Sequence, residues 1–241
     1  MKTITLKLFV VFFTTTLISS CGVDIFNRID GNRHVVTENR KLNDDFTAVK
    51  VSTGIDLYIT QGNNVSLTVE ADENLHDIIK TEVRDGELRI YSEKNIWRAK
   101  ARKVHLTVHT LNELKATSGS DVRSENTLKT DDFKVSVSSG ADARITVVAE
   151  SVASSASSGA DLRISGKTES HTSKATSGSS IRAYELKSTT TIVRASSGAG
   201  IDIHASKEID AKASSGGDID YRGNPKRINK KTSSGGSVSK Y

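Results

Sequence analysis

The chain has 241 residues, of which 26% are charged and only 5% aromatic, with one proline and one cysteine. So few bulky side chains argue against a compact sandwich or an α/β enzyme and favour a repeat protein that stacks small and β-branched residues in thin layers. The formal net charge is +5, and it falls to +3 without residues 1–20, which carry Lys2 and Lys7 and no acidic residue. The chain also has no run of basic residues interleaved with aromatic ones. We therefore expect no nucleic-acid partner.

The first twenty residues are predicted to be a lipoprotein signal peptide. Lys2 and Lys7 precede an apolar run from Leu8 to Ile18, which is too short to span a bilayer comfortably. The run ends in LISSCG, which resembles the lipobox of bacterial lipoproteins, where the cysteine is acylated after cleavage. Cys21 is the only cysteine, so a disulfide within the monomer is excluded. We expect Cys21 to be the lipid attachment site; a buried or accidental cysteine is the alternative.

The next stretches predict a tether followed by β-strands. Residues 21–43 have little periodicity and many polar residues, which is typical of a tether. Alternating apolar residues in FTAVKVSTGIDLYITQGNNVSLTVEA predict strands, with a turn at GNN. Asp72 is placed to cap a short helix over ENLHDIIK, and TEVRDGELRIYSE predicts a hairpin with Asp85 and Gly86 at its tip. Residues 44–241 are predicted to form one domain.

From residue 116 onward the chain repeats. Each repeat contains a glycine preceded by a serine, and the glycines are spaced 18 to 21 residues apart. These glycines are Gly119, Gly140, Gly159, Gly178, Gly198, Gly216 and Gly235. The stretch VSTGIDLYI resembles an eighth, diverged copy. A catalytic motif normally occurs once, so the recurrence of SSGAD points to architecture.

The positions around each glycine predict how the coils pack. In an extended chain, the third and fifth residues after the glycine share one face, and they are mostly aliphatic, as in Leu162 and Ile164. A coil of this length buries its apolar edge only against identical coils stacked about 4.8 Å apart. The sequence therefore predicts an all-β parallel solenoid. The glycine would permit a backbone conformation forbidden to other residues and let the next coil approach closely. By the same parity, the serine before it and the small residue after it would point inward if the strand stays extended through the glycine.

The outward positions carry two charged ladders. The second residue after the glycine gives an aspartate ladder and the fourth gives an arginine ladder, each of which would offset the repulsion within the other. The ladder residues are Asp121, Arg123, Asp142, Arg144, Asp161, Arg163 and Arg182. One interpretation is a solvated charge lattice without a ligand. The other is a contact surface for a repetitive polymer. A calcium ion between stacked carboxylates is disfavoured, because each arginine lies beside them.

Other candidate sites are weaker, and we predict no catalytic, metal or cofactor site. His105 and His109 have metal-like spacing, but a strand would place them about 13 Å apart, so we expect surface residues. His171 and His204 occur at different phases of the repeat, and no serine lies in a nucleophile elbow. Trp97 is interpreted as a hydrophobic plug, with a carbohydrate-stacking or membrane-facing aromatic as the alternative.

Four features carry a family resemblance: the stretches AVKVSTGIDLYITQG, EVRDGELRIYS and VHLTVHTLNELKATSGSDV, and the serial SSGAD corners. Together they resemble the head GIN domain family of auto-transporter adhesins. The resemblance covers residues 45–240. It implies a right-handed β-helix-like exported protein, frequently a lipoprotein, and it brings no catalytic residues. The aspartate and arginine pair is lost in the last copies, which interrupts a continuous ladder toward the C-terminus.

We therefore predict a non-enzymatic lipoprotein, anchored to a bacterial membrane on the periplasmic or surface side, that presents a repetitive solenoid face for adhesion or envelope interactions. Its partner would be a polysaccharide or another cell-surface polymer, held by many weak contacts. A β-helix enzyme that acts on polysaccharides is the alternative, since such folds carry lyases and hydrolases. A structural spacer in the envelope is a third hypothesis.

Overall fold

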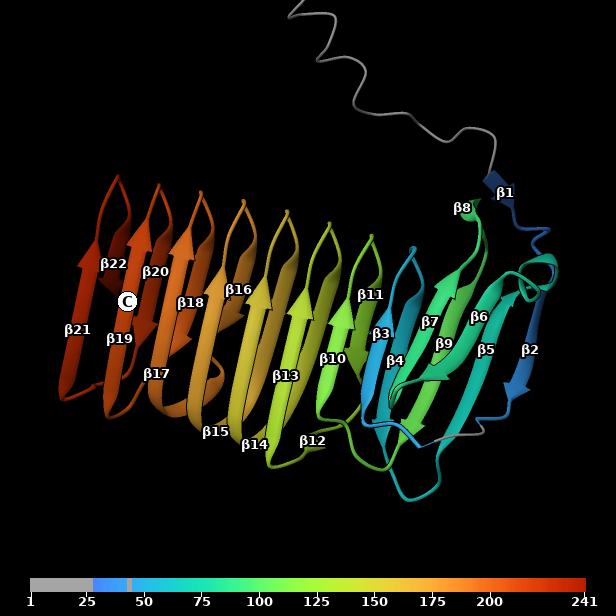
Figure 1. Cartoon of the computed structure of the whole chain (residues 1–241), viewed down its shortest axis with the longest axis horizontal. Helices are drawn as coiled ribbons and strands as arrows, with labels where there is room; N and C mark the ends of the chain where they lie inside the picture. The colour runs from blue at the N-terminus through green and yellow to red at the C-terminus, as the bar shows by residue number, and fades with distance from the viewer. Residues whose placement is uncertain (1–27, 43–44) are drawn as a thin grey trace, which may run out of the picture.

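A computed structural model describes residues 28–42 and 45–241, and the predicted signal peptide and Cys21 lie outside these residues. The described chain is a flattened parallel β-solenoid in which two sheets face each other across a thin core (Figure 1). Its one helical turn is the short 3-10 segment η2 (Glu73–Leu75). No helix in the described ranges is long and apolar enough to cross a bilayer.

The front sheet of Figure 1 runs in one parallel order from the N-terminal end to the C-terminal end. Its strands are β7 (Glu87–Ser92), β3 (Ala48–Val51), β10 (Glu113–Ala116), β13 (Asp132–Val137), the later halves of β14 (Asp142–Ala156) and β15 (Asp161–Ala175), β17 (Leu186–Ser196), β19 (Glu208–Ser214) and β21 (Arg227–Thr232). The strand β6 (Ile79–Arg84) pairs with β7 as the predicted hairpin.

The back sheet is parallel over the repeats and antiparallel at its N-terminal end. Its strands are β2 (Val35–Arg40), β5 (Ser66–Asp72), β9 (Arg102–Val108), β4 (Asp56–Gln61), β11 (Asp121–Ser124), the first halves of β14 and β15, β16 (Ser180–Ala183), β18 (Gly200–His204), β20 (Asp218–Arg222) and β22 (Ser237–Lys240). Two short strands, β1 (Arg28–Asp30) and β8 (Asn95–Arg98), pair beside the N-terminal end, and β12 (Leu128–Lys129) pairs with β14.

Each predicted corner joins the two sheets by a two-residue turn. In one coil Ser139 has φ +54° and Gly140 has φ +69°, and the Ala141 N–H donates to the Ser138 carbonyl at 3.2 Å. Two successive positive φ values define a type I′ turn. The Gly140 N–H also donates to the Ser158 carbonyl of the next coil at 3.1 Å, and the corners from Gly119 to Gly216 repeat this bond. The corners are therefore tied to one another as well as to their strands.

Two details of the predicted corner are wrong. The serine before each glycine does not point inward: Ser139 and Ser158 are exposed, because the chain turns at the serine instead of continuing extended through it. The corner glycines also do not make room for a neighbouring coil, because a Cβ at Gly159 would meet no atom within 4 Å. Only the left-handed backbone requires glycine there. Close approach occurs elsewhere: a Cβ at Gly166 would lie 1.9 Å from the Val147 carbonyl oxygen.

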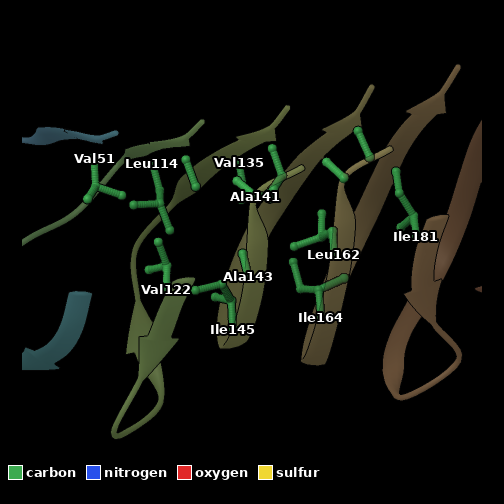
Figure 2. Packing of buried hydrophobic residues seen from close by; sticks show 14 of the residues in the cluster. Val51, Leu114, Val122, Val135, Ala141, Ala143, Ile145, Leu162, Ile164 and Ile181 are labelled. Atoms are coloured by element: carbon green, nitrogen blue, oxygen red, sulfur yellow. The ribbon is translucent and has the colours of Figure 1, made fainter. Parts of the chain in front are cut away.

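The aliphatic rows form the core, as predicted. Val122, Ala143, Leu162 and Ile181 lie in register on successive coils and are buried, and the fifth positions Ile145 and Ile164 are 2% exposed (Figure 2). The alanine after the glycine also points inward, as Ala141 shows. Stacked in this way, each coil supplies apolar surface that the next one covers.

Antiparallel strands and a buried carboxylate close the N-terminal end. Residues 28–40 fall inside the predicted tether, but β2 pairs with β5 and β1 with β8, so they belong to the folded unit. Asp72 makes no side-chain capping bond to η2. Its buried carboxylate instead accepts backbone N–H groups of Arg33, Lys100 and Ala101 at 2.9 to 3.2 Å. Burial alone would raise the pKa of Asp72, but these donors outweigh burial and lower it.

One inward row contains a histidine. His171 lies between Val152 and Thr191 in the front sheet and is fully buried. Its Nε2 lies 2.9 Å from Ser154 Oγ, which donates to Ser173 Oγ at 3.0 Å. The imidazole is therefore the donor at Nε2, and Nδ1 has no hydrogen-bond partner among the described residues. Burial lowers the pKa of His171 to about 4, so the ring is neutral at pH 7.

Substitutions at two glycines should show what close packing adds to backbone strain, because both Gly159 (φ +69°) and Gly166 (φ +121°) have positive φ and only Gly166 also has a close neighbour. Gly159→Ala should lower the free energy of unfolding by about 1–2 kcal/mol, the cost of a left-handed conformation for a residue with a Cβ. Gly159→Asn should cost less, because asparagine tolerates this region. Gly166→Ala should cost more than either, because its Cβ collides with backbone. Urea unfolding measures all three. Equal losses at positions 159 and 166 would contradict these roles.

His171 should make the protein less stable in mild acid. The unfolded chain binds a proton at the ordinary histidine pKa near 6.5, whereas the folded chain resists protonation down to about pH 4. Stability contributed by the neutral ring is thus complete above pH 6.5 and falls by about 3 kcal/mol as the pH drops to 4. His171→Gln keeps a donor for Ser154 and removes the titration. We expect the wild type to exceed the variant in free energy of unfolding by less, or to fall below it, as the pH is lowered. A difference that does not change with pH would refute this role of His171.

Candidate functional site: the arginine face of the back sheet

The two predicted ladders stand in register on the outer face of the back sheet. Asp121 is aligned with Asp142, which is aligned with Asp161. The arginine row runs parallel to them, and its members are Arg123, Arg144, Arg163 and Arg182. Neighbouring arginines are therefore one strand spacing, about 4.8 Å, apart.

The two ladders offset each other only in part, because the guanidinium groups of Arg144 and Arg163 oppose the rise that burial causes in the pKa of Asp142 without cancelling it. Arg182 Nη1 pairs with the Asp161 carboxylate at 2.9 Å. Within the described residues, Arg123, Arg144 and Arg163 make no ion pair and no side-chain hydrogen bond. The pKa of the Asp142 carboxyl is raised by burial first and then by the stacked carboxylates of Asp161 and Asp121. Like charges thus remain stacked in both rows, and three guanidinium groups have unused hydrogen-bonding capacity.

The arginines line an open groove of about 400 Å³. Arg123, Arg144, Arg163, Arg182 and Arg222 contribute to its walls, together with the hydroxyl-bearing residues Ser124, Thr146 and Ser165. Asp121, Asp142 and Asp161 do not line the groove, but the acidic residues Glu185 and Asp202 do. From Arg123 on β11 to Arg222 on β20 the groove crosses five strand steps, about 24 Å. The row of guanidinium groups therefore faces a long, shallow hollow with hydroxyl groups in its lining.

An aromatic and cationic stack lies at the C-terminal end of this groove. Tyr184 follows β16, and the Arg222 guanidinium lies 4.0 Å from its ring centroid and 4.4 Å from that of Tyr241. Burial raises the pKa of the Tyr184 phenol, and Asp202 and Asp220 add to this effect, so the phenol stays protonated. The sequence prediction missed this stack. The clue in the sequence was the aromatic residue Tyr184 in the twenty-residue coil between Gly178 and Gly198.

A second row of basic residues runs along the outer face of the front sheet and was also missed. The register aligns Arg89, Lys50, Lys115, Ser136, Ser155, Lys174, Arg194, Lys212 and Lys231. Lys115 pairs with Glu87 at 2.8 Å and Arg194 with Asp210 at 3.0 Å. This row could have been found by reading the fourth residue before each corner glycine. No groove accompanies it among the pockets of the described chain.

The remaining candidates assemble no second site. His105 and His109 are exposed, as expected, and His105 stacks on Tyr58 and pairs with Glu70. Among the described residues, no three His, Cys, Asp or Glu side chains gather as metal ligands. Ser154 and His171 are in contact, but both are buried and the serine accepts a hydrogen bond from the ring, which is the wrong direction for a general base.

Trp97 is not the predicted hydrophobic plug, because its side chain is 55% exposed and the preceding Ile96 is the buried residue. The corner glycines Gly119, Gly140, Gly159, Gly178, Gly198, Gly216 and Gly235 all take positive φ. Each lies in the sequence between a front-sheet strand and the back-sheet strand that follows it, and none of them lines the groove.

Comparisons with known proteins agree with this architecture. Of solved structures, a putative adhesin from Bacteroides fragilis superposes with a TM-score of 0.83 at 20% identity, covering 88% of this chain and all of that one. A putative lipid binding protein from Parabacteroides distasonis superposes with a TM-score of 0.70 at 21% identity, covering 89% of this chain and 99% of that one. At these identities the likeness concerns the fold. No curated protein matches the sequence.

A family model described as "Putative auto-transporter adhesin, head GIN domain" matches residues 45–225, three quarters of the chain and nearly all of the solenoid. The corners from Gly119 to Gly216, the hairpin after η2 and the charged ladder residues fall inside this match, and the last corner, at Gly235, lies beyond it. The chain therefore belongs to the head GIN domain family of auto-transporter adhesins.

Proposed function

We propose that the protein is a non-catalytic, exported lipoprotein of the cell envelope that adheres to a cell-surface polymer through the arginine face of its back sheet. The observation that carries this proposal is the row of Arg123, Arg144 and Arg163, which lines the groove and forms no ion pair among the described residues, although Glu185 and Asp202 also line that groove. Guanidinium groups are planar, always charged and suited to carboxylate, sulfate or phosphate groups. A charge lattice without a ligand would be expected to pair most of its arginines with aspartates, whereas three arginines on this rigid face are unpaired.

Multivalent contact would supply the affinity. Each exposed ion pair is worth about 0 to 1 kcal/mol, too little for binding by itself. The solenoid holds the arginines at a fixed repeat, so a polymer that engages one arginine presents its next charges to the neighbours at high effective concentration. Little backbone entropy is lost on binding, because the backbone is held in two hydrogen-bonded sheets, and the ordering cost falls on the arginine side chains.

The family and the solved relatives support an adhesive role. The family description and the Bacteroides fragilis structure both carry the word adhesin. Envelope localisation fits that description. Export through a signal peptide at 1–20 and acylation of Cys21 rest on the sequence alone, and they would place the solenoid beside a membrane.

Catalysis on a polysaccharide is a weaker alternative. A catalytic group occurs at one position, whereas the arginines and aspartates of this face recur from coil to coil. The titratable residues of the groove other than its arginines are Tyr184, Glu185 and Asp202. The raised pKa of Tyr184 makes it a poor base, and burial also raises the pKa of the Asp202 carboxyl. A passive spacer would leave the three arginines without a role.

Removal of the unpaired arginines should abolish adhesion and leave the fold intact. We expect Arg123→Thr, Arg144→Thr and Arg163→Thr together to weaken binding to envelope fragments by more than tenfold, because a multivalent contact loses avidity when its central points are lost. Threonine suits exposed strand positions. Binding isotherms at two salt concentrations measure the effect.

The matched control for this variant is Lys50→Thr, Lys174→Thr and Lys212→Thr, which removes the same charge from the front sheet at exposed positions. The control should bind like the wild type at both salt concentrations. If the two triple variants lose affinity equally, the attraction depends on net charge and the arginine face has no special role.

Lipid anchoring is tested at its single residue. Cys21→Ala should move the protein from the membrane fraction to the soluble fraction or leave it unprocessed, because acylation needs the thiol. Detergent-phase partitioning and the mass of the N-terminal peptide measure both outcomes. Partitioning identical to the wild type would refute anchoring at Cys21 without bearing on the arginine face.

A further inference from the structure

A second unassigned surface lies at the N-terminal end of the solenoid, where β1 and β8 pair (Figure 1). We call it the cap patch, and it consists of Arg28, Arg33, Trp97, Arg98 and Lys100. A hollow beside β8 is lined by the last four of these residues together with Arg102 and Lys103. The groove of the arginine face shares no residue with this hollow.

The patch combines an exposed aromatic with unpaired cations. Trp97 is 55% exposed, and the Arg28 guanidinium lies 4.4 Å from its ring centroid. In the described part of the chain, Arg28, Arg33, Arg98 and Lys100 form no ion pair with a carboxylate. An amphipathic indole next to unpaired basic side chains is the composition that proteins place at a membrane–water interface.

Nearby acidic groups do not cancel this charge. Asp56 lines the same hollow, where Arg102 opposes the rise in its pKa that burial causes. Lys103 is paired with Glu70 at 3.1 Å, and Glu73 with His34 at 3.3 Å. Asp30 is exposed on β1. Within the described chain, five basic residues that pair with no carboxylate, Arg28, Arg33, Arg98, Lys100 and Arg102, therefore stand against four carboxylates that no lysine or arginine pairs, Asp30, Asp56, Glu73 and the buried Asp72, so the basic groups exceed the acidic ones by one.

Buried hydrogen bonds hold the patch in shape. The Asp72 carboxylate accepts the backbone N–H groups of Arg33 and Lys100, which lie on the two loops that carry the basic side chains. The Gly31 N–H donates to the Arg98 carbonyl at 2.7 Å. A Cβ at Gly31 would lie 2.0 Å from Asp72 Oδ2, so this junction leaves no free volume. Little ordering would be required on contact with a flat partner.

The position of the patch along the chain favours a membrane as that partner. Arg28 is seven residues after Cys21, so the chain between them reaches at most about 25 Å even when fully extended. A lipid on Cys21 would hold the cap patch within that distance of the bilayer. The patch with an interfacial composition thus lies at the end of the chain that would carry the acyl group.

We propose that the cap patch docks onto the surface of an anionic phospholipid bilayer and acts as a second membrane contact beside the lipid anchor. The choice of a membrane rests on the anchoring at Cys21 proposed above. Basic side chains near an anionic surface add electrostatic attraction to an anchor, and an interfacial tryptophan adds apolar contact. Docking at this end would fix the orientation of the solenoid on the membrane.

Trp97 provides a direct measurement, because it is the only tryptophan in the chain. The protein from residue 21 onward, with Cys21→Ser, retains every residue of the described fold and lacks the lipid. We expect it to bind vesicles of phosphatidylcholine with 30–40 mol% phosphatidylglycerol, with a blue shift of the tryptophan emission and quenching by brominated lipid, and to bind pure phosphatidylcholine much more weakly.

Charge removal at the patch should weaken this binding. The triple variant Arg33→Asn, Arg98→Gln and Lys100→Gln keeps Trp97 as the probe, and asparagine tolerates the positive φ of Arg33. We expect vesicle affinity to fall on the order of a hundredfold, since three basic residues leave the surface. Lys50→Gln, Lys174→Gln and Lys212→Gln remove equal charge from the front sheet and should leave both affinity and spectrum unchanged.

Three outcomes would overturn the proposal. Unchanged Trp97 emission with anionic vesicles means that the patch does not touch the bilayer. Equal losses in both triple variants mean attraction by net charge alone. An equal spectral shift with soluble polygalacturonate at matched charge means a general polyanion site. Because this protein carries no lipid, none of these outcomes depends on acylation, and adhesion is tested separately by the arginine variants.

Discussion

The left-handed corner is the constraint on which the rest of the structure depends. Two successive residues with positive φ reverse the chain in the smallest space, and the glycine N–H of one corner bonds to the serine carbonyl of the next. Because every corner has the same length, the strands that follow start in the same phase, as the alignment of Asp142 with Asp161 shows. A side chain that faces inward in one coil then faces inward in all. Rows of identical residues, both apolar and charged, are a direct consequence of this turn.

Most of the solenoid could be predicted from the sequence, because the repeat length and the alternation of inward and outward residues can be recognised in the residue pattern. Glycine spacing gave the coil length, and Leu162 and Ile164 marked the inward face. Parity failed at Ser139, since it assumes an extended chain and the turn begins at that serine. The roles of Asp72 and Trp97 depend on contacts between loops distant in sequence, which no local pattern reveals. The ladders were placed correctly, but which arginines lack a partner depends on side-chain direction.

The charged rows arise at an electrostatic cost that the core has to offset. Stacked aspartates repel one another, as the raised pKa of Asp142 indicates, and stacked guanidinium groups do so as well. Arg182 relieves part of this by pairing with Asp161, whereas Arg123 and its two neighbours lie along the groove. The groove residues Ser124 and Thr146 are small, and this leaves the guanidinium groups accessible. A face arranged for maximal self-pairing would have filled that space.

The later coils indicate that the fold itself does not require these charges. After β16 the outward positions change from aspartate and arginine to Gly200 and Asp202, and in the last coil to Ser237 and Ser239. The register is unbroken, and the inward residue Ile219 remains fully buried. The chain thus contains its own comparison: coils with and without the arginine make the same corner, and up to β20 they share the same core. Since stacking does not select arginine, its recurrence over consecutive coils beside a groove is better explained by what the face contacts.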